Sequence, residues 1–112
     1  MSPFVKSALS VGILALCVNA SAATKTWDAG GAATDLNWLT PANWNADTLP
    51  AAGDDLVFAT GPAAGNRIVT NNFAANTVFH DIRITAASYA LWGNAINITG
   101  NVTNTGGNPA TA

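Results

Sequence analysis

The sequence predicts an all-β protein, and three features of its residues support that fold class. The 112 residues include neither Glu nor Gln, and Asn, Thr, Ala and Gly supply most of the chain. Gly-Asn pairs stand directly before β-branched runs, as turns stand before strands. Short runs also alternate aliphatic with polar residues, which is the two-residue period of a strand with one buried face. No helical period is present, so we expect short strands joined by turns.

The first 22 residues are predicted to be a secretory signal peptide. A single positive charge at Lys6 precedes an apolar run over residues 8–18, and Ala20-Ser21-Ala22 follows with small residues at cleavage spacing. The apolar run is too short to span the roughly 30 Å of a bilayer core. We therefore expect a secreted or cell-surface protein that begins at Ala23.

Cys17 is the sole cysteine, and it lies in the segment that should be removed. An alternative is a lipoprotein acylated on Cys17, but Leu16 stands where a small residue is usual. After cleavage no thiol remains, so neither disulfides nor thiolate metal sites can hold the fold. No membrane anchor is expected within the mature segment.

The charge pattern argues against nucleic acid as a partner. The formal net charge of −2 becomes −3 when Lys6 leaves, and the remaining cations, Lys25, Arg67 and Arg83, are widely spaced. A surface that binds phosphate backbones needs clustered Lys and Arg.

Residues 23–60 are predicted to form a Trp-rich N-terminal cap. Trp27, Trp38 and Trp44 are set among turn residues, and the segment closes with a strand-like run at residues 55–58. Buried indoles would make a compact plug, because each covers on the order of 200 Å². The alternative is a glycan platform, in which exposed indoles stack on sugar rings.

Residues 61–112 are predicted to contain repeated short strands. Gly65-Asn66, Gly93-Asn94 and Gly100-Asn101 each precede a β-branched run, with further strand-like runs at residues 78–85 and 89–92. This pattern fits either stacked parallel β-coils, with Asn ladders at the turns, or an antiparallel β-sandwich, and the period alone does not choose.

Two strands of this region have clear faces. Strand alternation places Ile82, Ile84, Ile96 and Ile98 in one shared core, whereas Arg83 and Asn97 point away from it. A charge at position 84 should therefore prevent folding, and a charge at position 83 should be nearly silent.

The chain resembles the opening of proteins with autotransporter-associated β-strand repeats. The resemblance rests on Thr26-Trp27-Asp28, Asn37-Trp38, Asn43-Trp44, Pro50, residues 54–58 and the repeat-like runs 79–84 and 89–100. It implies a right-handed parallel β-helix within a large passenger, with residues 61–112 as its first repeats. Residues 106–112 indicate a turn within a longer architecture, so we expect a fragment whose partners are further coils of the same chain.

No catalytic, cofactor-binding or metal-ligating residue is expected, and we predict that the protein is not an enzyme. His80 is the only histidine and is interpreted as a local hydrogen-bonding group. Asp54-Asp55 offers oxygen ligands for calcium, but no calcium-loop pattern surrounds it, which favours a turn or strand-start role. The six Asp include no recognisable acid–base pair, and no nucleophile elbow occurs.

The expected function is therefore a structural or adhesive role outside the cell. The rival is a carbohydrate-binding module, or the N-terminal part of a β-helix polysaccharide-active enzyme, with an extracellular glycan or host surface as partner.

Overall fold

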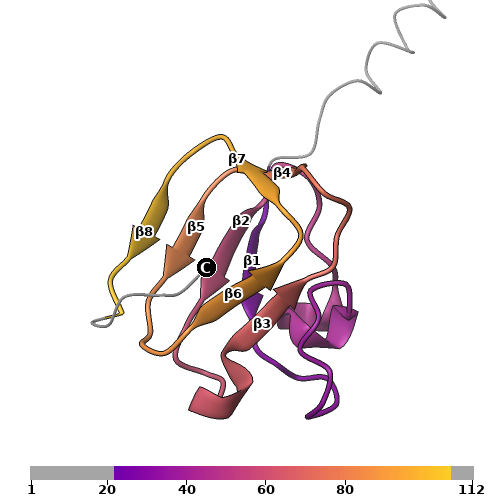
Figure 1. Ribbon diagram of the computed structural model, residues 1–112, viewed down its shortest axis with the longest axis vertical. Coiled ribbons are helices and arrows are strands. Elements are labelled where there is room, and N and C mark those ends of the chain that lie inside the picture. Colours follow the sequence, from indigo (N-terminus) through magenta and orange to yellow (C-terminus); the bar gives the residue numbers. More distant parts are fainter. Residues whose placement is uncertain (1–21, 107–112) are drawn as a thin grey trace, which may run out of the picture.

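The computed structural model describes residues 22–106, and these residues form short β-strands joined by turns (Figure 1). The predicted all-β class is confirmed. Residues 1–21 of the predicted signal peptide and residues 107–112 lie outside the described part. Within residues 22–106, no helix is long and apolar enough to cross a bilayer. The strands are β1 Thr24–Trp27, β2 Asp55–Phe58, β3 Ile68–Asn71, β4 Thr77–Phe79, β5 Ile82–Ile84, β6 Ala90–Gly93, β7 Ile96–Ile98 and β8 Val102–Asn104, with 3-10 turns η1 Pro41–Asn43, η2 Asn45–Asp47 and η3 Ala64–Asn66.

The strands form three short parallel sheets. Sheet A has the order β1-β2-β5-β8, sheet B pairs β3 with β6, and sheet C pairs β4 with β7. Every pairing between these strands is parallel, so the antiparallel sandwich is wrong for the described residues. Parallel neighbours need a long crossover, and after β2 each crossover passes through the other two sheets.

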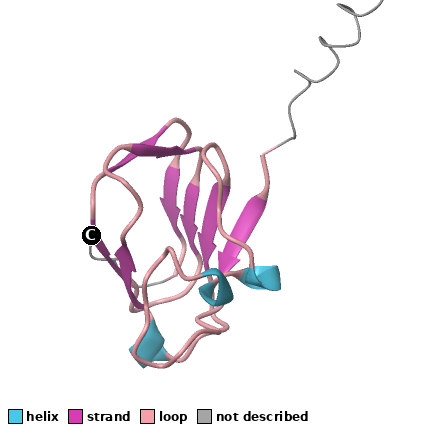
Figure 2. Ribbon diagram, turned by 90° about the vertical axis from the view of Figure 1, so that its right-hand side faces the viewer, coloured by secondary structure: helices cyan, strands magenta, loops and turns pink. Residues whose placement is uncertain are grey.

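The chain visits the sheets in a constant order. From β2 it runs through sheet B and sheet C and returns to sheet A at β5, and it repeats this route to reach β8. Figure 2 shows the strands of the three sheets on three sides of the molecule. The strand-like run at residues 78–85 is divided, because β4 ends at Phe79 and β5 starts at Ile82 in another sheet. The corner between them consists of His80 and Asp81.

Side chains that point into the core lie beside one another on neighbouring strands, and their exposed fraction rises toward β8. Leu56 is opposite Ile82, which is opposite Val102, and their exposed fractions are 0%, 4% and 63%. Ile82 and Ile84 are buried, and Ile96 and Ile98 are partly buried against the same core. Arg83 and Asn97 are exposed, so the predicted strand faces are confirmed.

Residues 24–53 line the first edge of all three sheets. β1 pairs with β2 in sheet A. Beside sheet B, Trp38 N donates to Thr70 O (2.9 Å) and Thr70 N donates to Leu36 O (2.9 Å). Beside sheet C, Gly53 N donates to Val78 O (2.8 Å). The Trp-rich segment is therefore an irregular first layer on which the regular strands stack.

Asparagines link neighbouring layers through the backbone. The buried Asn71 donates from Nδ2 to Asn94 O (2.8 Å), and Asn94 donates from Nδ2 to Phe73 O (2.8 Å). In place of the expected ladder of side chain to side chain bonds, each of these two amides donates to a backbone carbonyl outside the strands.

Candidate functional site

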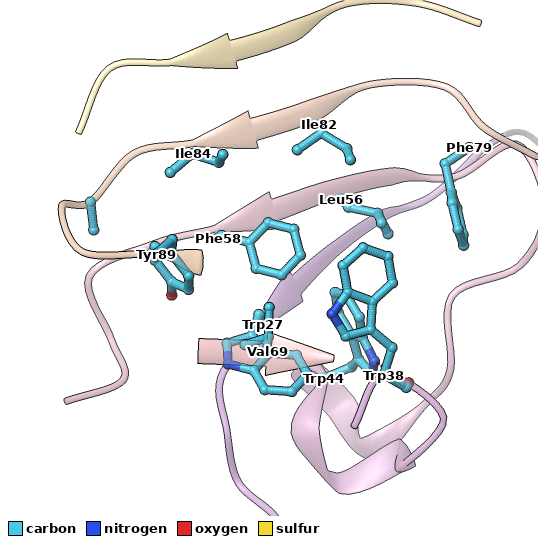
Figure 3. Close-up of a cluster of buried hydrophobic side chains, with 11 residues drawn as sticks. Trp27, Trp38, Trp44, Leu56, Phe58, Val69, Phe79, Ile82, Ile84 and Tyr89 are labelled. Atoms are coloured by element: carbon cyan, nitrogen blue, oxygen red, sulfur yellow. Dashed lines mark hydrogen bonds between the residues drawn. The ribbon is translucent and has the colours of Figure 1, made fainter. Parts of the chain in front are cut away.

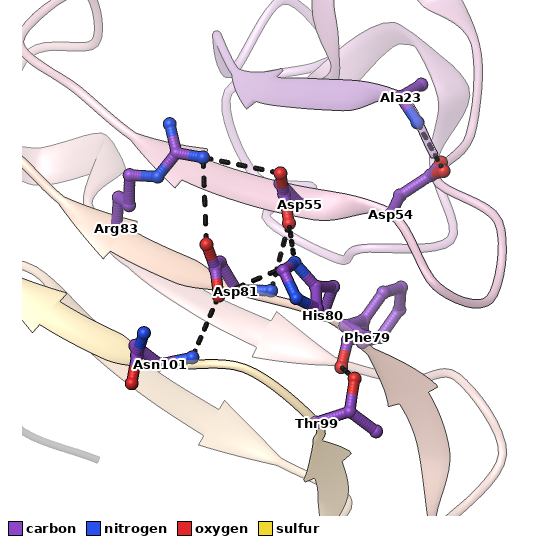
Figure 4. Close-up of polar contacts among 9 residues, drawn as sticks. All are labelled: Ala23, Asp54, Asp55, Phe79, His80, Asp81, Arg83, Thr99 and Asn101. Atoms are coloured by element: carbon purple, nitrogen blue, oxygen red, sulfur yellow. Dashed lines mark hydrogen bonds and ion pairs between the residues drawn. The ribbon is translucent and has the colours of Figure 1, made fainter. Parts of the chain in front are cut away.

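The corner between β4 and β5 gathers four charged or titratable side chains (Figure 4). His80 Nδ1 lies 2.8 Å from Asp55 Oδ1 and 3.5 Å from Asp81 Oδ1. Arg83 Nη2 lies 3.3 Å from Asp55 Oδ2 and 3.8 Å from Asp81 Oδ2. The imidazole and the guanidinium therefore contact different oxygens of the same two carboxylates. We call these four residues the corner cluster.

Backbone hydrogen bonds between layers hold the corner cluster in place. Asp81 N donates to Asp55 Oδ1 (3.0 Å), and Asn101 N donates to Asp81 Oδ1 (2.8 Å). His80 N donates to Asp54 O (2.9 Å), which fixes the main chain beneath the imidazole. The carboxylate and imidazole groups are thus oriented by the same contacts that stack one layer on the next.

The pKa of Asp55 lies below its usual value. The main cause is the hydrogen bond with His80. The Asp81 backbone N–H and the positive charges of His80 and Arg83 also lower the pKa, whereas partial burial raises it. A hydrogen bond or a nearby cation favours the ionised carboxylate. Asp55 is therefore a carboxylate over the whole neutral range.

The sequence interpreted His80 as a local hydrogen-bonding group, whereas its imidazole contacts Asp55, which lies 25 residues earlier in the chain. It missed the meeting of Asp55 with Asp81, which are distant in sequence. The parallel register explains why they meet. Leu56 pairs with Ile82, and Asp55 and Asp81 directly precede these two residues. Two Asp residues that precede paired residues in adjacent parallel strands must lie close together.

Asp54 has the turn role that the sequence favoured. Its Oδ2 accepts from Ala51 N (2.8 Å) and its Oδ1 accepts from Ala23 N (2.9 Å). Asp28 Oδ1 likewise accepts from Gly30 N (3.0 Å). These carboxylates close turns in the first layer.

Asp35 organises the loop between β1 and η1. Thr40 Oγ1 donates to its Oδ2 (2.7 Å) and Asn37 N donates to its Oδ1 (3.1 Å). These hydrogen bonds, with that of Thr40 first, lower the pKa of Asp35. Of the six Asp, Asp55 and Asp81 are brought together beside His80.

The three tryptophans of the first layer pack in the core, as the plug interpretation predicts (Figure 3). Trp27, Trp38 and Trp44 are at most 1% exposed. Trp44 meets Trp27 edge to face at 5.3 Å and Trp38 at 6.0 Å between ring centroids. Trp44 Nε1 donates to Trp38 O (2.7 Å), so the plug is joined by a polar bond as well as by apolar contact.

An apolar cavity opens at the β8 end of the described residues. Its volume is about 340 Å³, and its lining includes Leu91, Ile96, Ile98 and Val102. Trp92, which also lines it, is 58% exposed. Among residues 22–106, the inward side chains of the last layer are therefore more exposed than those of the first layer.

No protein-family model, curated protein or solved structure matches this chain. The resemblance to autotransporter-associated repeats stays a prediction.

Proposed function

We propose that this chain is the N-terminal segment of a secreted or surface-displayed passenger protein, a right-handed parallel β-helix with a structural or adhesive role and no catalytic role. The single observation that carries the proposal is the repeated passage of the chain through sheets A, B and C, with parallel pairing at every step. Such stacking makes a rod whose length grows with each added layer.

The first layer supports a capping role for residues 23–60. Thr26 N, at the outer edge of β1, donates to Asn45 Oδ1 (2.7 Å). The amine of Lys25, which is 8% exposed, contacts Thr48 Oγ1 and lies 3.4 Å from Asn45 O. The η2 turn thus covers the β1 edge, and a covered edge cannot recruit a further strand.

The β8 end supports growth in the other direction. In the sheets formed by residues 22–106, β6, β7 and β8 are the last strands of their sheets, and Val102 presents an aliphatic side chain that is 63% exposed. The surface best suited to this end is another layer with aliphatic residues at the inward positions.

Export and display are tested in producing cells. An antibody against residues 23–60 should label intact cells or the medium, and mass spectrometry should find Ala23 as the first residue. Ala22→Trp should block cleavage because a large residue occupies the processing site, whereas Asn19→Ser should leave it unchanged. Detection of residues 1–6 in the mature protein, or exclusively cytoplasmic antigen, contradicts the proposal, and an acyl group on Cys17 assigns the protein to the lipoproteins.

A carbohydrate-binding role is a second candidate, and the exposure of Trp92 is the observation that favours it. In the register of sheet B, Trp92 pairs with Thr70. A screen against a polysaccharide panel, with Trp92→Ala beside Leu39→Ala, decides the matter. Binding that disappears with Trp92→Ala alone would promote the carbohydrate role over the structural one.

A further inference from the structure

We propose that Asp55, His80 and Asp81 form a binding site for a divalent transition-metal ion of the Zn²⁺ class. One carboxylate oxygen from each Asp and one ring nitrogen of His80 all lie within 4.8 Å of one another. The site goes beyond the proposed scaffold role and does not depend on it.

The separations suit coordination by one ion. Zinc binds His nitrogen and carboxylate oxygen at about 2.0–2.2 Å, so two ligands in a tetrahedral site are roughly 3.4 Å apart. His80 Nδ1 lies 2.8 Å from Asp55 Oδ1 and 3.5 Å from Asp81 Oδ1. Replacing the proton shared at Nδ1 by a metal ion therefore requires only small movements of side chains.

Backbone hydrogen bonds orient the two carboxylates, and each Oδ1 atom keeps a second lone pair for a metal ion. Arg83 contacts Oδ2 of both carboxylates, which leaves both Oδ1 atoms toward the imidazole. Backbone N–H groups of Asp81 and Asn101 donate to the two Oδ1 atoms. Outer contacts of this kind hold metal ligands in position, and the 51% exposure of the His80 side chain leaves room for water as a further ligand.

Charge and ligand type determine which ion is favoured. With a neutral imidazole, two carboxylates and one guanidinium sum to a charge of −1, which attracts a cation. The imidazole nitrogen favours Zn²⁺, Ni²⁺ or Co²⁺ over Mg²⁺ and Ca²⁺, which prefer oxygen. The guanidinium of Arg83 repels the incoming ion, so its removal should strengthen binding.

His80 is the only histidine in the chain, so its imidazole gives unambiguous NMR signals. The experiment uses the full chain without an affinity tag and with Cys17→Ser, so that the single thiol adds no ligand. Zn²⁺ is titrated at pH 7.4, with Mg²⁺ in parallel, while ¹⁵N imidazole shifts and calorimetric heat are recorded. We expect saturable binding of one Zn²⁺ per chain with a shift of Nδ1, and no response to Mg²⁺.

Three variants complete the test. His80→Gln keeps a hydrogen-bond donor for Asp55 but lacks the imidazole ligand, and it should weaken Zn²⁺ binding by at least about tenfold. Asp47→Asn, an exposed carboxylate elsewhere, should bind as the parent does, and Arg83→Gln should bind more tightly. Circular dichroism verifies that each variant is folded. The proposal is overturned if the parent shows no saturable shift, or if folded His80→Gln binds Zn²⁺ as tightly as the parent.

Discussion

The hydroxyl of Tyr89 donates a hydrogen bond to the backbone carbonyl of Ala59 across 2.6 Å. The Tyr89 ring meets Phe58 edge to face at 5.4 Å between centroids, and the guanidinium of Arg67 lies 5.5 Å from the ring centre. Burial raises the pKa of Tyr89 to about 12, although the nearby charge of Arg67 acts in the opposite direction. The neutral phenol is thus part of the packed core, and its ionisation opposes folding.

Tyr89 should therefore make stability depend on alkaline pH. Because its folded pKa is raised, its contribution is complete below the unfolded pKa near 10 and is lost as the pH rises toward 12. Tyr89 is the only tyrosine, so absorbance at 295 nm reports it directly. We expect a titration midpoint near 12 in the folded protein and near 10 in denaturant.

Tyr89→Phe tests whether the phenol causes this effect. The variant lacks the ionising group, so its free energy of unfolding should decline less between pH 10 and 12 than that of the parent. Equal declines in the two proteins, or a folded midpoint near 10, would show that Tyr89 is not held in its neutral form.

Much of the strand pattern is local and follows from the sequence. The alternation around Arg83 and Asn97 predicted which Ile side chains are inward, because a strand has a fixed two-residue period. The choice between parallel and antiparallel pairing depends on contacts between layers, and the period carries no information about them. The turn at His80 and Asp81 within residues 78–85 could not be predicted from the sequence either. Its hydrogen bonds are made with other layers, and the local pattern carries no information about them.

The corner cluster was less accessible to sequence reasoning than the core. His80 has no nearby ligand in the sequence pattern other than Asp81, and Asp55 joins it only because β2 and β5 pair in parallel. Once that register is known, the matched positions of the two Asp become visible. The register between paired strands must therefore be known before a set of metal ligands can be recognised in such a chain.

Trp38 and Trp44 should contribute strongly to stability. Replacing either by Ala leaves a large cavity in the first layer, so we expect a loss of about 3 to 5 kcal/mol in the free energy of unfolding. Trp92→Ala is the matched control, and because this side chain is 58% exposed its loss should be at most about 1 kcal/mol. Urea denaturation followed by circular dichroism measures all three. Similar losses at Trp92 and Trp44 would contradict the assignment of the plug.

Gly93 should tolerate no side chain. Its φ is +107°, and an added Cβ would lie 2.2 Å from Asn71 O, where the two layers approach closely. We expect Gly93→Ala to destabilise the protein by more than about 1 kcal/mol, because strain and collision act together. Gly65 has open space around its Cβ position and no positive φ, so Gly65→Ala should change stability by less than about 0.5 kcal/mol. Equal midpoints for the two variants in urea would exclude the close approach at Gly93.

The last prediction concerns the two faces of the strands. Ile84 is 3% exposed and lies between Phe58 and Asn104 in sheet A, so Ile84→Asp places an unpaired carboxylate inside the core. Such a charge costs several kcal/mol, which is comparable with the whole stability of a small domain. We expect this variant to be unfolded, as judged by circular dichroism and by rapid proteolysis.

Asn97→Asp is the matched control, because Asn97 is exposed between two inward Ile residues and its amide makes only a long contact of 3.5 Å to Asn76 O. Its stability should lie within about 0.5 kcal/mol of the parent. The sequence predicted that Arg83→Asp would have almost no effect on stability. The structure changes this expectation, because Arg83 contacts Asp55 and Asp81, and a third carboxylate at this position would repel both. Arg83→Asp should therefore be less stable than Arg83→Gln, with the difference shrinking at high salt as the repulsion is screened. If Ile84→Asp folds, or if Asn97→Asp unfolds, the inward register of these strands is wrong and the stacked arrangement loses its physical basis.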